Sequence, residues 1–208
     1  MKKTVLIYGD SNVWGNTPDA KRLPDEQQWA QILATNLGEN YKIVQEGLCG
    51  RYAGGFEFRE RSYYNGHRHF EAIFRTASPV DFVIIALGTN DLNPTYGRTI
   101  KDIADDILWY GTKIAQIIAG SSGESLPQFL FILPPNFDTD KMVAYFPKGA
   151  FDEAARLKVN KILKSHVPDY LEFNEIDLSE DGLHFSVQGH AQMAAKVFAK
   201  MKEMENGQ

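Results

Sequence analysis

The chain has 208 residues, of which 43% are hydrophobic and 24% charged, an ordinary composition for a globular protein with one core. Its formal net charge of −5 offers no basic surface of the kind that binds DNA or RNA. The single cysteine, Cys49, cannot form an internal disulfide, and no apolar run reaches the roughly 18 residues that would span a bilayer. We therefore expect one cytoplasmic domain over residues 1–208, with no nucleic-acid or membrane partner.

Five short apolar segments are predicted as strands, and helical segments alternate with them along the chain. The predicted strands cover residues 4–8, 41–46, 81–87, 128–133 and 170–173. The predicted helices cover residues 27–37, 69–77, 100–120, 150–166 and 186–204. Residues 82–87 are apolar at every position, which is typical of strands buried on both faces of a parallel sheet. The pattern predicts an α/β fold, a three-layer α/β/α sandwich of the flavodoxin-like type with a five-stranded parallel sheet.

Ligands of such sheets bind beyond the carboxyl ends of the strands, so the residues that follow each strand are candidates for a site. In chain order these segments are 9–11 (GDS), 46–51 (EGLCGR), 88–91 (GTND), 134–136 (PPN) and 181–184 (DGLH). Together they supply a serine, a histidine, an aspartate, a side-chain amide and two turns that contain glycine. These are the parts of a hydrolytic site with a serine nucleophile.

Each of these polar residues suits one role in that chemistry. Ser11 is the candidate nucleophile, His184 is the base that takes its proton, and Asp181, three positions before His184, orients the imidazole. An oxyanion needs preorganised N–H donors, which the backbone amides of Ser11 and Gly50 and the side chain of Asn90 would supply. Such a mechanism needs no metal ion and no organic cofactor.

Three blocks of the sequence resemble the SGNH (GDSL-like) hydrolases: GDSN at 9–12, GTND at 88–91 and DGLHFS at 181–186. The stretch EGLCGR at 46–51 and the Trp14-Gly15 pair are similar to the arylesterase and acyltransferase branch of that family. The resemblance implies a serine esterase that cleaves short, acetyl-type esters through an acyl-enzyme. It also implies transfer of the acyl group to an alcohol where water is excluded, and assembly into a homo-oligomer.

The substrate, a small-molecule ester, needs a pocket beside these groups. The segment 136–149 is rich in aromatic residues and follows the fourth predicted strand, so it is a candidate hydrophobic wall. The loop 55–66 is expected to shape the entrance. The residues that we expect to line the pocket are Asn12, Trp14, Arg51, Phe137, Met142, Tyr145 and Phe146.

The sequence leaves alternatives open. A carbohydrate O-acetylesterase or a thioesterase would use the same machinery on another substrate. Ser11 would also serve as an ordinary turn residue in a non-catalytic module that binds a phosphate or a sugar through backbone amides. The turn lacks the G-x-x-x-x-G-K-[ST] phosphate-binding sequence, and binding alone does not require Asn90, Asp181 and His184 at other strand ends.

Overall fold

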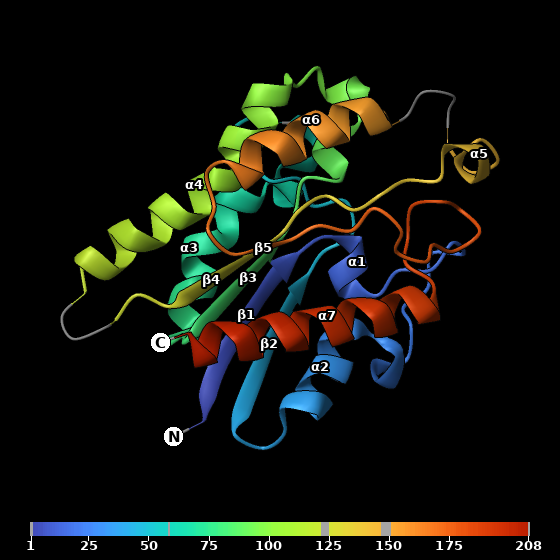
Figure 1. The fold of residues 1–208 in the computed structure, drawn as a ribbon. Helices are drawn as coiled ribbons and strands as arrows, with labels where there is room; N and C mark the ends of the chain where they lie inside the picture. Colours follow the sequence, from blue (N-terminus) through green and yellow to red (C-terminus); the bar gives the residue numbers. More distant parts are fainter. Residues whose placement is uncertain (1, 58, 122–124, 147–150, 208) are drawn as a thin grey trace.

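The computed structural model describes residues 2–57, 59–121, 125–146 and 151–207, and in it five parallel strands form one sheet (Figure 1). The sheet order is β2-β1-β3-β4-β5, with every neighbouring pair parallel. The strands are β1 (Lys3–Gly9), β2 (Tyr41–Gly47), β3 (Phe82–Ala86), β4 (Gln128–Ile132) and β5 (Tyr170–Leu171). The predicted α/β fold with a five-stranded parallel sheet is confirmed.

Helices cover both faces of the sheet (Figure 1). Helices α2 (Trp29–Leu37) and α7 (Val187–Asn206) pack together on one face. Helices α3 (Gly66–Ala77), α4 (Ile100–Ala119) and α6 (Glu153–Lys164) cover the other. The short helices α1 (Ser11–Trp14) and α5 (Thr139–Met142) lie in loops, as do the 3-10 turns η1 (Asp25–Gln27), η2 (Arg59–Tyr64), η3 (Asn90–Leu92) and η4 (Pro94–Tyr96).

Strand β1 explains why the strands are apolar without alternation. Its residues Val5 and Ile7 belong to the core under α2 and α7, whereas Leu6 and Tyr8 belong to the core under α3 and α4. Successive side chains of a strand point to opposite faces, and both faces here are covered, so every position has to be apolar. All four of these side chains are fully buried.

The element boundaries differ from the predicted ones where side chains or tertiary contacts decide them. Strand β5 ends at Leu171, two residues before the end of the predicted strand. Phe173, the last residue of the predicted strand, is buried in the core, and its carbonyl accepts a hydrogen bond from Asn136 N in the loop after β4 instead of from a strand. Helix α3 begins three residues earlier, where Asn65 caps it. Helix α6 begins at Glu153 because Asp152 is its N-cap; residue 150, included in the predicted helix, lies outside the described residues.

The sheet order places the ends of β1 and β3 side by side. The chain moves outward from β1 to β2 and then returns across β1 to β3. This is the point where the direction of winding reverses, and it leaves a crevice beyond the carboxyl ends of the two strands. Ser11 follows β1 and Asn90 follows β3, so the fold brings two of the predicted site residues to this crevice.

Candidate active site

Ser11 is the first residue of a single helical turn that follows β1 directly. Asp10 caps this turn, its Oδ1 accepting a hydrogen bond from Asn12 N at 2.9 Å. The turn ends at Gly15, whose φ of +87° belongs to the left-handed region that glycine adopts without strain. Both Gly15 N and Asn16 N donate to the carbonyl of Ser11. The sequence GDSNVWGN thus folds into a tight turn that fixes the serine at the edge of the sheet.

A continuous chain of hydrogen bonds joins Ser11, His184 and Asp181. Ser11 Oγ lies 3.0 Å from His184 Nε2, and His184 Nδ1 lies 2.5 Å from Asp181 Oδ2. The three side chains are buried, and Ser11 and His184 line a common pocket. A hydroxyl, an imidazole and a carboxylate in this order form the arrangement of a serine hydrolase.

The carboxylate of Asp181 is held by its own loop. Its Oδ1 accepts from the backbone amides of Leu183 at 3.0 Å and His184 at 2.9 Å, which leaves Oδ2 for the imidazole. Gly182 adopts a φ of +70°, and a Cβ there would lie 2.3 Å from the carbonyl oxygen of Asp138. Burial alone would raise the pKa of Asp181, but the hydrogen bonds from His184 and from the backbone outweigh it and lower the pKa. The group is therefore a carboxylate at neutral pH.

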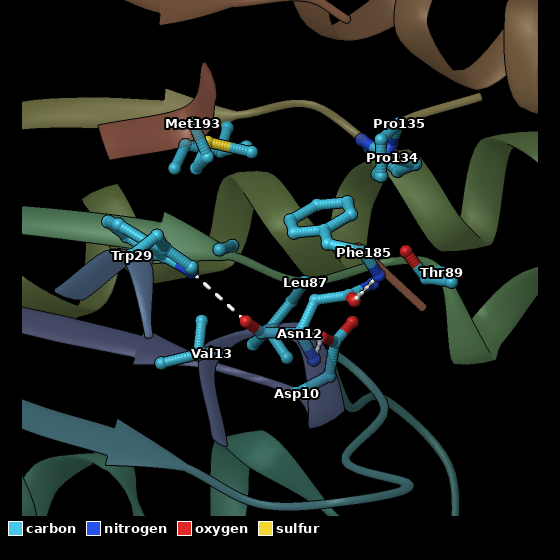
Figure 2. A pocket seen from close by; sticks show the side chains of 12 residues that line it. Asp10, Asn12, Val13, Trp29, Leu87, Thr89, Pro134, Pro135, Phe185 and Met193 are labelled. Atoms are coloured by element: carbon cyan, nitrogen blue, oxygen red, sulfur yellow. Dashed lines mark hydrogen bonds between the residues drawn. The ribbon is translucent and has the colours of Figure 1, made fainter. Parts of the chain in front are cut away.

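Asn12, predicted to line the substrate pocket, instead turns away from it and holds the histidine loop. Its Oδ1 accepts from Phe185 N at 2.9 Å, and its Nδ2 donates to the carbonyl of Leu183 at 3.4 Å. Trp29 Nε1 donates to the backbone carbonyl of Asn12 at 3.0 Å (Figure 2). Asn12, the residue after the nucleophile, therefore holds the residues directly before and after His184 in the sequence, Leu183 and Phe185.

A small cavity of about 20 Å³ lies behind the nucleophile turn, with Asp10, Asn12, Thr89 and Phe185 among its lining residues (Figure 2). It has room for about one water molecule. Burial raises the pKa of Asp10 to about 6, although Asn12 N and the nearby His184 and Arg51 act in the opposite direction. Asp10 lies behind the turn and does not line the pocket in which Ser11 and His184 meet.

The pocket at Ser11 has a volume of about 300 Å³ and a mixed polar and apolar lining. It is lined by Ser11, Asn16, Cys49, Gly50, Tyr64, Asn90, Asn93, Tyr96, Phe146, Phe151, Leu183 and His184. The three residues predicted to donate N–H groups to an oxyanion, Ser11, Gly50 and Asn90, are thus brought together. Asn90 is oriented by a hydrogen bond from its Nδ2 to the carbonyl of Arg51 at 3.0 Å.

Arg51 and Trp14, two more predicted pocket residues, are not among the described residues that line it. The Arg51 side chain is buried, and its Nη1 donates to the carbonyls of Gly9 at 2.9 Å and Glu46 at 2.5 Å. Its guanidinium lies 4.0 Å from the centre of the Tyr8 ring. Arg51 therefore holds the ends of β1 and β2 together, and Trp14 is half-buried against Arg22.

The predicted aromatic wall is built in part from other residues. Of the four predicted members, Phe146 lines the pocket, Phe137 and Met142 are buried in the core, and Tyr145 is exposed. Residues 147–149 of the predicted segment lie outside the described residues, as does residue 58 of the predicted entrance loop. Phe151, which the sequence did not single out, completes the wall: its ring centre lies 6.0 Å from that of Phe146.

Tyr64 of the predicted entrance loop 55–66 lines the pocket, whereas three other lining residues were missed by sequence reasoning: Asn16, Asn93 and Tyr96. Of these three, only Asn16 carried a usable signal, since it lies five positions after Ser11 and directly follows Gly15, which ends the nucleophile turn. Cys49 lines the pocket as well. Burial, together with the charge of Asp10, raises the pKa of its thiol to about 11, so the thiol is protonated at neutral pH.

Within the described part of the chain, no three His, Cys, Asp or Glu side chains come together as a metal ion would require. None of the helices in the same residues is long and apolar enough to cross a membrane.

Comparison with known proteins agrees with this class of site. Residues 5–197 match the GDSL-like Lipase/Acylhydrolase family. A carbohydrate acetylesterase from Sinorhizobium meliloti is similar in structure, with 25% identity, a TM-score of 0.81 and coverage of 98% of this chain and 100% of that one. The aryl esterase of M. smegmatis has 24% identity, a TM-score of 0.83 and coverage of 97% and 99%. No curated protein is significantly similar to the chain in sequence.

The match covers nearly the whole chain, and the chain belongs to the GDSL-like lipase/acylhydrolase family. Its general activity is that of a serine ester hydrolase.

Proposed function

We propose that the protein hydrolyses short, acetyl-type carboxylic esters through an acyl-enzyme on Ser11. The observation that carries the proposal is the chain of hydrogen bonds from Ser11 Oγ through His184 to Asp181 at the wall of a pocket. Ser11 Oγ attacks the acyl carbonyl and passes its proton to His184 Nε2, while Asp181 holds Nδ1–H and stabilises the imidazolium. The proton then goes to the leaving alcohol.

The second half of the reaction reverses these roles. Water attacks the acyl carbon and gives its proton to His184 Nε2, and Ser11 Oγ leaves and takes that proton back. In both halves the negative oxygen is stabilised by the Ser11 and Gly50 amides and the Asn90 side chain, which lie around the same pocket. Transfer of the acyl group to another alcohol follows the same steps, with that alcohol in place of water.

The size and lining of the pocket support a short acyl group. Phe146 and Phe151 form its apolar side, and Phe151 is backed by Phe137, with 5.3 Å between ring centres. A volume of about 300 Å³ is at the lower end of the range of small-molecule sites.

A carbohydrate O-acetylesterase is the second candidate. Three asparagines and two tyrosines line the pocket, Asn16, Asn90, Asn93, Tyr64 and Tyr96, and such amides and hydroxyls suit a polyhydroxy alcohol. The similar protein from Sinorhizobium meliloti is described as a carbohydrate acetylesterase.

The test is an assay of purified protein on p-nitrophenyl acetate, butyrate and octanoate, with Ser11→Ala in parallel. We expect turnover of the short esters and loss of nearly all activity in the folded variant. Equal rates for the two proteins would refute the role of Ser11. Release of acetate from acetylated xylo-oligosaccharides, compared with p-nitrophenyl acetate, separates the carbohydrate substrate from the simple ester.

Two further proposals concern the molecule as a whole. We infer a homo-oligomer, supported by Val143 and Tyr145, apolar side chains exposed on the segment that leads to Phe146. Light scattering of the purified protein gives its mass directly. We also infer a cytoplasmic location, consistent with a single free cysteine, and cell fractionation tests it.

A further inference from the structure

Asn16 contacts the one nitrogen of His184 on which the proposed chemistry depends. Its Nδ2 lies 3.1 Å from His184 Nε2, and Ser11 Oγ lies 3.0 Å from the same atom. Because Nδ1–H of the neutral ring donates to Asp181, Nε2 carries a lone pair. The hydroxyl of Ser11 and the amide of Asn16 are therefore two donors that face one acceptor.

The position of Asn16 is set by the nucleophile turn itself. Its backbone N–H donates to the carbonyl of Ser11 at 3.0 Å, and its backbone pairs with Arg22 in an isolated β-bridge. The side chain lines the same pocket as Ser11 and His184. Asn16 is thus held in a fixed relation to the serine, on the side of the imidazole where substrate and water would enter.

We infer that Asn16 is a positioning residue that keeps the His184 ring in place when the Ser11 hydroxyl is esterified; the inference rests on the proposed function. In the acyl-enzyme, Ser11 Oγ has no proton to donate to Nε2. Among the described residues, Asn16 is then the side chain that still donates to it. The ring therefore keeps Nε2 directed towards the acyl group, so that Nε2 can accept the proton of the water that attacks the acyl carbon.

An amide suits this role because it serves both protonation states of the ring. It donates through Nδ2 to the neutral imidazole, and after a half-turn of the side chain it accepts through Oδ1 from the imidazolium. A carboxylate at the same position would only accept. It would stabilise the imidazolium and so withhold the base at neutral pH.

The other titratable groups around the ring are at different positions. Asp181 contacts Nδ1, Asp10 and His190 interact with the ring through their charge, and Cys49 lines the pocket. A change of charge at residue 16 therefore acts on Nε2 directly.

The first test follows the protonation of His184 by NMR in a Ser11→Ala background, where no turnover is needed. We expect Asn16→Asp to raise the midpoint of the His184 titration by about one pH unit or more. The matched control is Asn93→Asp, which adds the same charge to the same pocket and keeps the cap on Thr95 N. Equal shifts in the two variants would overturn the inference.

The second test separates the two halves of the reaction by stopped-flow burst kinetics with p-nitrophenyl acetate. Asn16→Ala should slow deacylation about fivefold, the value of one hydrogen bond, and slow acylation less because Ser11 then also holds the ring. An unchanged deacylation rate constant would overturn the inference. If the proposed function itself is wrong, the result is a different one: the wild type gives no burst of p-nitrophenol, and its rate equals that of Ser11→Ala.

Discussion

Asn12 Oδ1 accepts the backbone amide of Phe185 at 2.9 Å, joining the nucleophile turn to the loop that carries the imidazole. The two residues are 173 positions apart in the chain. The distance between Ser11 Oγ and His184 Nε2 therefore depends on a side chain whose hydrogen bonds go to other groups, the amide of Phe185 and the carbonyl of Leu183.

Replacing Asn12 with alanine should reduce both stability and activity. The change leaves the buried Phe185 N–H without its acceptor, which costs about 1–3 kcal/mol, and it frees the histidine loop. We expect a lower free energy of unfolding in urea and a fall in kcat that exceeds the change in KM. The control is Asn36→Ala on the exposed face of α2. Equal unfolding free energies for the two variants would contradict this interpretation.

Asp181→Asn should abolish most of the turnover while leaving the fold intact. An amide at this position presents N–H to the imidazole and favours the wrong tautomer, so Nε2 loses its lone pair. The expected loss in kcat is on the order of 10⁴-fold, the value known for the same change in the triad of a serine protease. Glu180→Gln removes a carboxylate one residue away on an exposed side chain and should have little effect. A similar loss in both variants would mean that the loss of a nearby negative charge, and not the tautomer of His184, lowers kcat.

His190 should make the protein sensitive to acid. Its ring is fully buried, with Nδ1 accepting from Trp29 N at 3.2 Å, and burial, with a smaller contribution from His184, lowers its pKa to about 4. An unfolded chain takes up this proton near pH 6.5. The stability that a neutral His190 contributes is therefore complete above pH 6.5 and is lost as the pH falls towards 4, by on the order of 3 kcal/mol.

The measurement is the free energy of unfolding in urea from pH 7 to pH 4. His190→Asn keeps an acceptor for Trp29 N and does not titrate, so its stability should fall less over this range than that of the wild type. His166→Asn, at an exposed histidine, is the control and should follow the wild type. If the His190→Asn and wild-type curves run parallel, another group causes the acid sensitivity.

Phe151→Ala should shift the preference of the enzyme towards longer acyl chains. The ring forms the wall of the pocket between Phe137 and Phe146, and its removal opens space beside the acyl group. Because each methylene accommodated in an apolar pocket contributes about 1–3 kcal/mol, we expect the ratio of kcat/KM for butyrate over acetate to rise about tenfold or more. Phe198→Ala on α7 removes a partly buried ring elsewhere, and the same change in ratio there would argue against the wall.

The sequence by itself determined the layers of the fold and the polar residues at the strand ends. Short apolar runs without alternation are typical of strands buried on both faces, and parallel strands bring their carboxyl ends to one edge. Ser11, Asn90, Asp181 and His184 could be chosen on that basis, since each lies just past a strand or in a short loop near the same edge. These are local properties of the chain.

Only the tertiary structure decided which side chains face the pocket. Arg51 and Asn12 lie next to site residues in the sequence, but their side chains turn into the protein. There Arg51 donates to the carbonyl of Gly9 and Asn12 accepts from the amide of Phe185, buried backbone groups of distant segments that need a hydrogen-bond partner. Phe151 reaches the pocket through contacts with Phe137 and Phe146 that no local pattern encodes. The direction of a side chain depends on the segments packed around it, and these come together only when the chain has folded.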